Sequence, residues 1–212
     1  MSAHLSSDVA FTPSVKAVQT RRRSRAAYAE MEARGGFRTE ITSDLVDFLS
    51  EIDTAYLATA NTNGQPYAQH RGGPRGFIGQ VDERTLGFTD FSGNRQYITT
   101  GNLAENDRAF LFLMDYANRR RVKIWGRARV VEDDPALLAR LMPEGYRARG
   151  EQVILFEVEA WDSNCPQHIP QKLDATDVAG AMAHLQSRVA ELEDENGALK
   201  LRLEERTQGD NA

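Results

Sequence analysis

The strongest constraint on the fold is a pair of strand-like runs joined by a two-residue turn. The run AFLFLMDY (109–116) is apolar, Ala117-Asn118 supplies the turn, and RRRVKIWGRARVVE (119–132) returns. Strand alternation places Arg119, Arg121 and Lys123 of the returning run on one face. A chain that doubles back through so short a turn forms antiparallel strands, because parallel strands need a long crossover.

Further strand-like runs extend this pattern over residues 41–165. They are TAYLATAN (54–61), PYAQHR (66–71), residues 77–81, TLGFTDF (85–91) and EQVILFEVEAWD (151–162). Asn63-Gly64, between the first two, is a strong hairpin signal. Short helices are expected at 41–52, at 94–106 and from Asp134-Pro135 to about Leu141. At least six strands of hairpin character predict a mainly β fold, an antiparallel barrel rather than a doubly wound parallel sheet.

The rest of the chain divides into an arm and a C-terminal extension. Residues 1–40 predict a helical arm, with one helix from Pro13 to about Met31 that ends at Gly35-Gly36. Its arginine run reads as a solvated helix face. The barrel domain is expected over 41–170. A linker (171–181), a coiled-coil helix (182–204) and a disordered tail (205–212) are expected after it.

The coiled-coil prediction rests on apolar residues spaced alternately three and four apart. They are Met182, Leu185, Val189, Leu192, Leu199 and Leu203, with the leucines 185, 192 and 199 at d, and Asn196 occupies the a position between Leu192 and Leu199. A β-branched residue at a, leucine at d and a single Asn at a favour a parallel two-stranded dimer. The alternative is an amphipathic helix that packs on its own domain.

Bulk properties exclude several classes of protein. The net charge of −5 argues against general nucleic-acid binding. The single cysteine, Cys165, rules out an internal disulfide and a cysteine-rich zinc site. No apolar run reaches the roughly 20 residues of a membrane span, and no secretory signal is evident. We therefore expect a cytoplasmic protein without membrane or nucleic-acid partners.

An anion site is indicated where residues 85–91 run into Ser92-Gly93, Asn94 and Arg95. Glycine allows close backbone approach, the first N–H groups of a helix are unpaired, and Arg adds a fixed charge. A second basic cluster, Arg119 to Arg129, lies within the returning strand. It indicates either an anion site or a solvated hairpin face.

These segments together resemble a known family. The stretches are "YLATANTNGQPYAQHRGG", "TLGFTDFSGNRQY", "NLAENDRAFLFLMDY" and "RRRVKIWGRARVVE". They resemble the pyridoxamine 5'-phosphate oxidase-like flavoproteins, more narrowly a predicted flavin-nucleotide-binding branch, over about residues 41–170. The resemblance implies an FMN-binding split β-barrel that forms a homodimer, with FMN between subunits. It also implies an FMN-dependent oxidoreductase acting on a small molecule.

The resemblance also implies the site. The family's Thr-Asn-Tyr-Gly-Ser-Arg-Lys stretch, which contacts the flavin and its phosphate, matches residues 89–96, and its later Arg-Gln pair falls on Arg120 and Arg121. The implied cofactor-binding residues are His70, Arg71, Thr89, Asp90, Phe91, Gly93, Asn94, Arg95, Gln96, Arg121 and Lys123. Arg121 or Lys123 is expected to stabilise the reduced flavin. The oxidases' C-terminal substrate-binding signature has no counterpart here, so the substrate stays open.

WDSNCPQHIP (161–170) is the other unusual stretch. Gln167 and His168 are candidate catalytic residues if it forms a lid over the flavin, and the alternative is a proline-fixed turn that ends the barrel. Cys165 with His168 gives too few ligands for a closed zinc site, so no metal is expected. Two rival functions remain. The barrel could bind haem, with His70 or His168 as axial ligand, or a deazaflavin, or it could be a non-catalytic module that assembles through its coiled coil.

Overall fold

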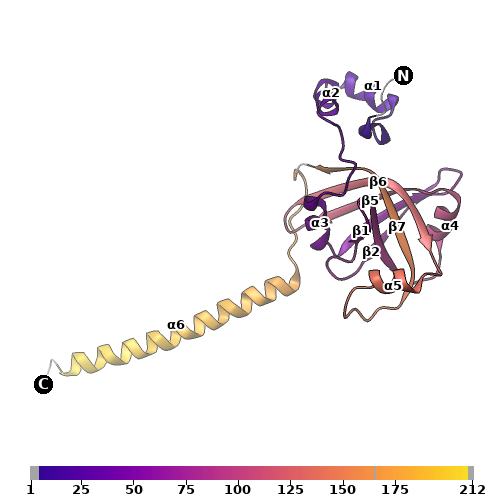
Figure 1. Cartoon of the computed structure of the whole chain (residues 1–212). Helices are drawn as coiled ribbons and strands as arrows, with labels where there is room; N and C mark the ends of the chain where they lie inside the picture. Colours follow the sequence, from indigo (N-terminus) through magenta and orange to yellow (C-terminus); the bar gives the residue numbers. More distant parts are fainter. Residues whose placement is uncertain (1–4, 165, 210–212) are drawn as a thin grey trace. The chain divides into compact units, whose positions relative to one another are not determined.

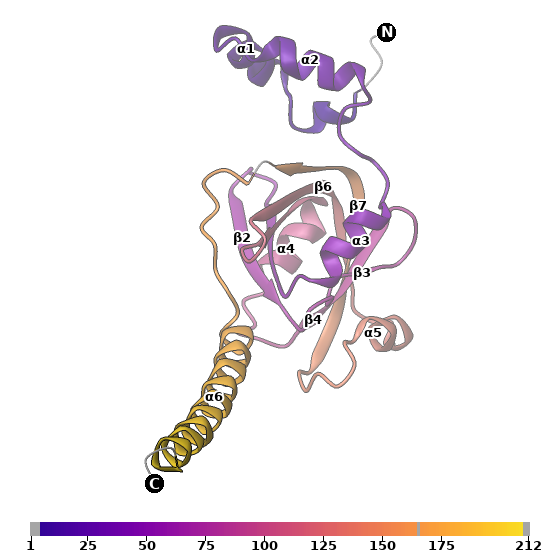
Figure 2. The same ribbon diagram turned by 90° about the vertical axis from the view of Figure 1, so that its left-hand side faces the viewer.

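A seven-stranded antiparallel sheet dominates the computed structural model, which describes residues 5–164 and 166–209. The strand order is β2-β1-β5-β6-β7-β4-β3, and the sheet curls on itself into a barrel (Figures 1 and 2). The strands are β1 (Thr54–Ala60), β2 (Pro66–Gly72), β3 (Gly79–Gln80), β4 (Thr85–Phe91), β5 (Arg108–Asp115), β6 (Arg120–Val131) and β7 (Gly150–Asn164). The predicted antiparallel barrel is confirmed.

The helices lie around this barrel and after it. They are η1 (Ser6–Val9), α1 (Pro13–Arg21), α2 (Arg25–Ala33), α3 (Ser43–Ser50), α4 (Ile98–Glu105), α5 (Pro135–Leu141) and α6 (Ala175–Gly209). Helices α3 and α4 lie toward opposite ends of the barrel (Figures 1 and 2). The described chain divides into two units at Ile169 and Pro170, and α6 belongs to the second.

Local signals formed as predicted where a single turn or cap decides the structure. Gly64 adopts a left-handed φ of +80° in the turn between β1 and β2. Such a φ suits glycine because it lacks a Cβ. The Asp134 carboxylate accepts a hydrogen bond from the Leu137 N–H (2.9 Å) and so caps α5.

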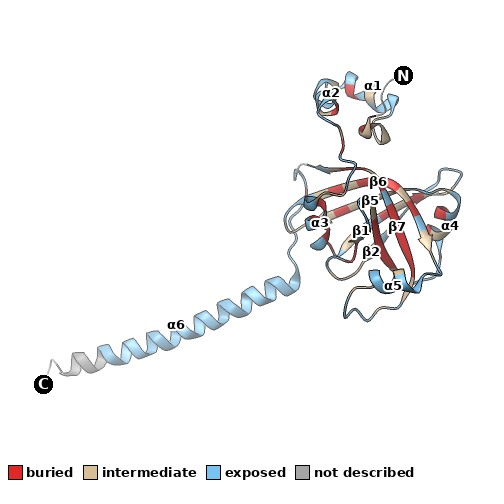
Figure 3. Cartoon of the chain, in the orientation of Figure 1, coloured by how far each residue is buried: buried red, intermediate tan, exposed pale blue. Residues whose placement is uncertain are grey.

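The barrel core follows the two-residue periodicity of the strands. On β5, Leu111 and Leu113 are fully buried, and Val122 and Ile124 of β6 pack in the same core (Figure 3). The alternate residues of β5, such as Phe112, face outward and are only half-buried. β5 is therefore apolar on both faces, and this chain covers the outer face only in part.

The arm segment from Pro13 to Ala33 contains two helices where the sequence predicts one, so that prediction is wrong. Helix α1 ends at Arg21, and Arg23 adopts a left-handed φ of 63° before α2 begins at Arg25. The reversal lets Arg25 and Lys16 reach the buried Glu32 carboxylate. Periodicity within the segment cannot reveal this, because the ion cluster joins residues from both helices.

Aromatic side chains dock the arm on the outer face of the barrel. Phe37 stacks on Trp125 of β6, with ring centroids 5.2 Å apart and planes at 6°. The Trp161 indole N–H donates to the Glu40 carbonyl (2.8 Å). The backbones of Arg38 and Trp161 also exchange two hydrogen bonds, of 3.1 and 2.8 Å. The arm is thus an ordered cover for part of the face that β5 and β6 present.

The second unit is dominated by one long helix. Helix α6 begins at Ala175 and continues to Gly209, so it extends beyond both ends of the 182–204 segment and through part of the tail expected to be disordered. Throughout the described part of the chain, no helix combines the length and apolar character needed to cross a membrane.

Candidate functional site

A polar pocket lies where β2 and β4 end and the chain approaches α4. Its volume is about 190 Å³. The pocket is lined by Gln69, Arg71, Asp90, Phe91, Gly93, Asn94, Arg95, Tyr97, Thr99, Thr100 and Glu151. We call this the polar pocket. It is smaller than the roughly 300–1,000 Å³ of most ligand sites, so it suits one polar group and not a whole cofactor.

A second hollow of about 210 Å³ adjoins the polar pocket and shares Arg71, Asp90 and Phe91 with it. Thr89 lines this inner hollow and is only 3% exposed. Among the described residues, its hydroxyl has no hydrogen-bond partner. Buried hydroxyl groups are normally paired, so this one marks a place where a ligand atom could bind.

A buried ion pair joins β2 to β4 at the base of the pocket. The Arg71 guanidinium bonds to the Asp90 carboxylate, and the two side chains are 11% and 13% exposed. These strands share no ladder of backbone hydrogen bonds, so side chains close the barrel here. Burial lowers the pKa of Arg71, and the Asp90 charge opposes that shift.

Polar partners hold this ion pair in place but leave one donor free. The Gln152 amide donates to Asp90 (2.9 Å) and to the Thr100 hydroxyl (3.0 Å). The Nε of Arg71 is buried and has no partner among the described residues. A guanidinium held by an acid on one side, with Nε unused, can still donate to an anion.

The loop from Ser92 to Tyr97 forms the pocket's outer wall, and the sequence predicts helix from residue 94 onward. Arg95 and Tyr97 both adopt left-handed backbone conformations, with φ of 61° and 52°. Each costs roughly 1–2 kcal/mol for a residue with a Cβ, and such strain is typical of binding sites. This geometry delays the start of α4 to Ile98, so the prediction of helix from residue 94 is wrong.

Side-chain hydrogen bonds fix the orientation of Arg95. The Tyr97 hydroxyl donates to the Glu151 carboxylate (2.6 Å) and accepts from the Arg95 Nε (3.2 Å). The hydrogen bond to Tyr97, and then the nearby Glu151 charge, raise the pKa of Arg95. Arg95 is exposed and always charged, so it can meet an anion that enters from solvent.

Most of the predicted cofactor residues come together here. Eight line the pocket or the inner hollow: His70, Arg71, Thr89, Asp90, Phe91, Gly93, Asn94 and Arg95. Gln96 adjoins them, because its N–H donates to the Asn94 side chain (3.2 Å). They come from β2, from β4 and from the loop that follows β4.

Arg121 and Lys123 do not join this group within one chain. Both lie on the outward face of β6, and neither lines the pocket or the inner hollow. Lys123 pairs with Asp162 (3.0 Å) and lies 5.2 Å from the Trp125 ring. Arg121 lies over Phe112 (6.0 Å), and its buried Nε has no partner among the described residues. The implied set of cofactor-binding residues therefore does not converge completely within one chain, because β1 and β5 separate β6 from β2, and β7 separates it from β4.

The two candidate catalytic residues lie elsewhere. Gln167 and His168 are exposed after β7, and neither lines the pocket or the inner hollow. Their proposed role as a lid is therefore without support from the geometry. Cys165 lies outside the described residues. Among the residues that are described, no group of three or more His, Cys, Asp or Glu side chains could hold a metal ion.

Several pocket residues escaped sequence reasoning. Gln69 shares a strand face with Arg71, so alternation along β2 could have identified it. Thr99 was hidden in the predicted helix, and its hydroxyl bonds to Gln69 (2.7 Å). Glu151 and Gln152 reach the pocket only because β7 pairs with β4, a contact between segments some 60 residues apart.

The curled antiparallel sheet with a polar pocket at its closing edge defines a split β-barrel. The chain belongs to the pyridoxamine 5'-phosphate oxidase family, whose model matches residues 41–165. No curated protein matches it.

Three solved structures illustrate the likeness. HupZ from Group A Streptococcus is 18% identical (TM-score 0.48) and covers 63% of this chain and 99% of its own. A putative pyridoxamine 5'-phosphate oxidase from Lactobacillus delbrueckii is 20% identical (TM-score 0.45), and the match covers 59% of this chain and 95% of that one. An FMN-binding protein from Syntrophomonas wolfei is 11% identical (TM-score 0.45), and the match covers 69% of this chain and 97% of that one.

Proposed function

We propose that this protein is an FMN-dependent oxidoreductase that acts on a small molecule. The observation that carries the proposal is the pair of unused buried donors at the polar pocket, Arg71 Nε and the Thr89 hydroxyl, beside the exposed Arg95. An FMN phosphate carries a charge of about −2 and three acceptor oxygens. Membership of the oxidase family makes a flavin phosphate the anion to test first.

The charges in the pocket argue for a further cation. Arg71 and Arg95 contribute two positive charges, and Asp90 and Glu151 contribute two negative ones. The formal charge of these four groups is therefore zero, which is too little for a dianion held in a partly dry site. Arg121, with its unused Nε, is available on the outward face of β6, and a second copy of the chain could bring it to this pocket.

A second copy of the chain could also cover the apolar side chains on the outer face of the barrel. Tyr56 of β1 is 37% exposed, and Phe110, Phe112 and Met114 of β5 are half-buried on the same side of the sheet. A dimer across this face would bury apolar area and give the flavin ring a site that the 190 Å³ pocket cannot. The proposed active form is therefore a homodimer with FMN between subunits.

In this proposal the protein's residues bind and orient while the cofactor does the redox chemistry. Bound FMN would accept and donate the electrons. Arg71 and the Thr89 hydroxyl would donate to phosphate oxygens from inside, and Arg95 would close over the phosphate from solvent. Tyr97 and Glu151 would hold Arg95 in its strained conformation, so that little side-chain entropy is lost on binding.

The absorption spectrum of the purified protein and its titration with FMN test the cofactor. Flavin bands, or saturable binding of added FMN, are expected. A Soret band would indicate haem instead. A colourless protein that FMN does not titrate would overturn the proposal.

Substituting Arg95 by Met should raise the Kd for FMN. Losing a charge-assisted bond costs roughly 1.5–3 kcal/mol, which is roughly a ten- to hundredfold change in Kd. The matched control is Arg75→Met, because Arg75 is also exposed (52%) but lines neither the pocket nor the inner hollow. Equal affinity in both variants would show that the phosphate binds elsewhere.

Turnover separates an enzyme from a carrier. The flavin-loaded protein should pass electrons repeatedly from a reduced nicotinamide, used as a probe donor, to an acceptor dye. Tightly bound flavin without turnover would favour a non-catalytic flavin-binding module.

A further inference from the structure

We infer that α6 pairs with α6 of a second copy as a parallel, in-register coiled coil. Helix α6 has 35 residues. Its apolar seam residues from Met182 to Leu203 are between 46% and 67% exposed (Figure 3). In proteins, most helix stability comes from packing an apolar face and not from intrinsic propensity. A helix of this length with an open seam therefore fits a partner helix.

Charged residues beside the seam identify that partner as a copy of the same chain. In the heptad with Met182, Val189, Asn196 and Leu203 at a, Arg188 and Glu195 occupy g. Glu193 and Lys200 occupy e. A parallel coiled coil pairs each g residue with the e residue five positions later on the other helix. Arg188 then meets the second copy's Glu193, and Glu195 meets the second copy's Lys200.

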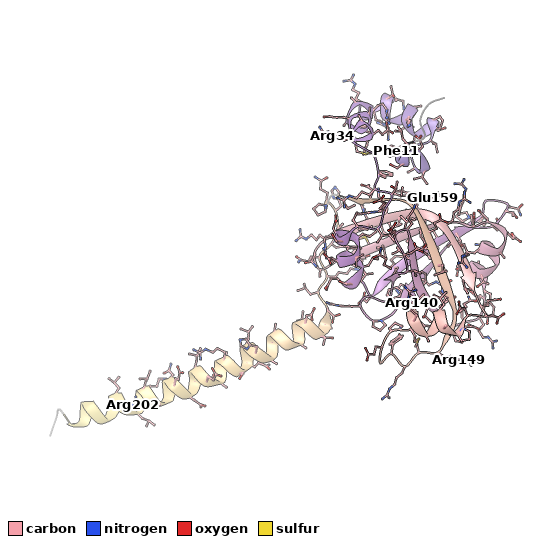
Figure 4. All side chains as sticks on the ribbon, viewed as in Figure 1. Phe11, Arg34, Arg140, Arg149, Glu159 and Arg202 are labelled. Atoms are coloured by element: carbon pink, nitrogen blue, oxygen red, sulfur yellow. The ribbon has the colours of Figure 1, made fainter. Side chains whose placement is uncertain are left out.

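Both charged pairs are attractive, and symmetry repeats each of them. The other two g–e pairs, Ala181 with Gln186 and Arg202 with Thr207, each contain an uncharged residue. No like-charged pair therefore opposes self-association in this register. Arg202 (Figure 4) lies on the exposed surface of α6.

Asn196 selects the direction of pairing. In a parallel, in-register pair the two Asn196 amides meet and bond to each other, at some cost in stability. An antiparallel pair places a residues against d residues, so Asn196 would face a leucine with its amide unsatisfied. A slip by one heptad would set Asn196 against Val189 or Leu203.

A parallel pair also decides which barrels are joined. It places both Ala175 residues at the same end, and only residues 170–174 separate α6 from the first unit. Five residues span at most roughly 17 Å. Two barrels tethered so closely reach an effective concentration on the order of millimolar. The helix pair thus tethers the two barrels that carry it, whether or not FMN binds.

Cysteine cross-linking in the full-length chain tests the geometry, with Cys165 replaced by Ser. Under mild oxidation, Leu185→Cys and Leu199→Cys are each expected to form disulfide-linked dimers, because equal d positions face each other only in a parallel, in-register pair. Ala190→Cys, at a b position on the outside, is the matched control and should remain monomeric under denaturing conditions.

Charge reversal tests the pairing within the same Leu199→Cys background. Glu195→Lys or Lys200→Glu alone should slow cross-linking roughly tenfold, because each creates two like-charged pairs. The double reversal should restore the wild-type rate, and mixing the two single variants should cross-link them to each other. Three outcomes would overturn the inference. The first is no cross-link in either the Leu185→Cys or the Leu199→Cys variant, and the second is a cross-link that forms only between these two variants when they are mixed. The third is a cross-linking rate that charge reversal does not change.

Discussion

Replacing Asp90 by Asn should strongly destabilise the barrel. The change leaves the Arg71 guanidinium, only 11% exposed, without its counter-charge at the closing edge of the sheet. Breaking a buried ion pair from one side typically costs 3–5 kcal/mol. The side-chain oxygen of Asn can still accept the hydrogen bond from the Gln152 amide. We therefore expect a loss of stability at the lower end of this range, about 3 kcal/mol.

Urea unfolding of the ligand-free protein measures this loss. With a urea dependence of about 2 kcal/mol per molar, the midpoint should fall by about 1.5 M. The control is Arg71→Met with Asp90→Leu, which removes both charges and should unfold within about 1 kcal/mol of wild type. A midpoint unchanged in Asp90→Asn would show that water screens the pair, and the electrostatic closure of the barrel would be refuted.

Three further predictions concern a glycine, an acid and a hydroxyl. Gly126→Ala should lower the free energy of unfolding by about 1–3 kcal/mol or more in a urea melt, because the new Cβ would lie 2.0 Å from the Glu157 carbonyl oxygen. The control is Gly101→Ala in α4, where a Cβ would meet open space, and this change should not destabilise the protein. Burial alone would raise the pKa of Asp115, but hydrogen bonds from neighbouring residues outweigh it, so the folded-state pKa is lowered. Asp115 therefore stabilises the protein above the unfolded-state pKa of about 3.9 and loses this effect as pH falls through the lower folded-state value. Asp115→Asn should therefore make stability depend less on pH below about pH 4. Thr89→Val should raise the ligand-free melting temperature, by removing an unsatisfied buried hydroxyl, yet weaken FMN binding in a titration; a lower melting temperature would show that this hydroxyl is satisfied.

The sequence predicted most of the fold because short-range chemistry decides it. The Asn63-Gly64 turn and the alternation along β5 and β6 each operate within a few residues. Pairing those segments by hairpins leads to an antiparallel barrel with little further information. The break in the arm helix at Arg23 was missed, because it depends on where Glu32 finds its cationic partners.

The site was predicted less completely, for a physical reason. His70, Arg71 and Arg95 stand at strand ends, where sequence position indicates proximity to a pocket. Glu151 and Arg121 depend on strand order, which places Glu151 beside β4 and leaves two strands between Arg121 and β2. Local patterns identify charged residues but not the strand on which each one approaches the pocket.

The docking of the arm has an optical consequence. The chain has two tryptophans, Trp125 and Trp161, and arm residues contact both. Phe37 shields one indole from water, and the Glu40 carbonyl holds the N–H of the other. Intrinsic emission at long wavelength would therefore signal that the arm has lifted, and the protein carries its own reporter for that movement.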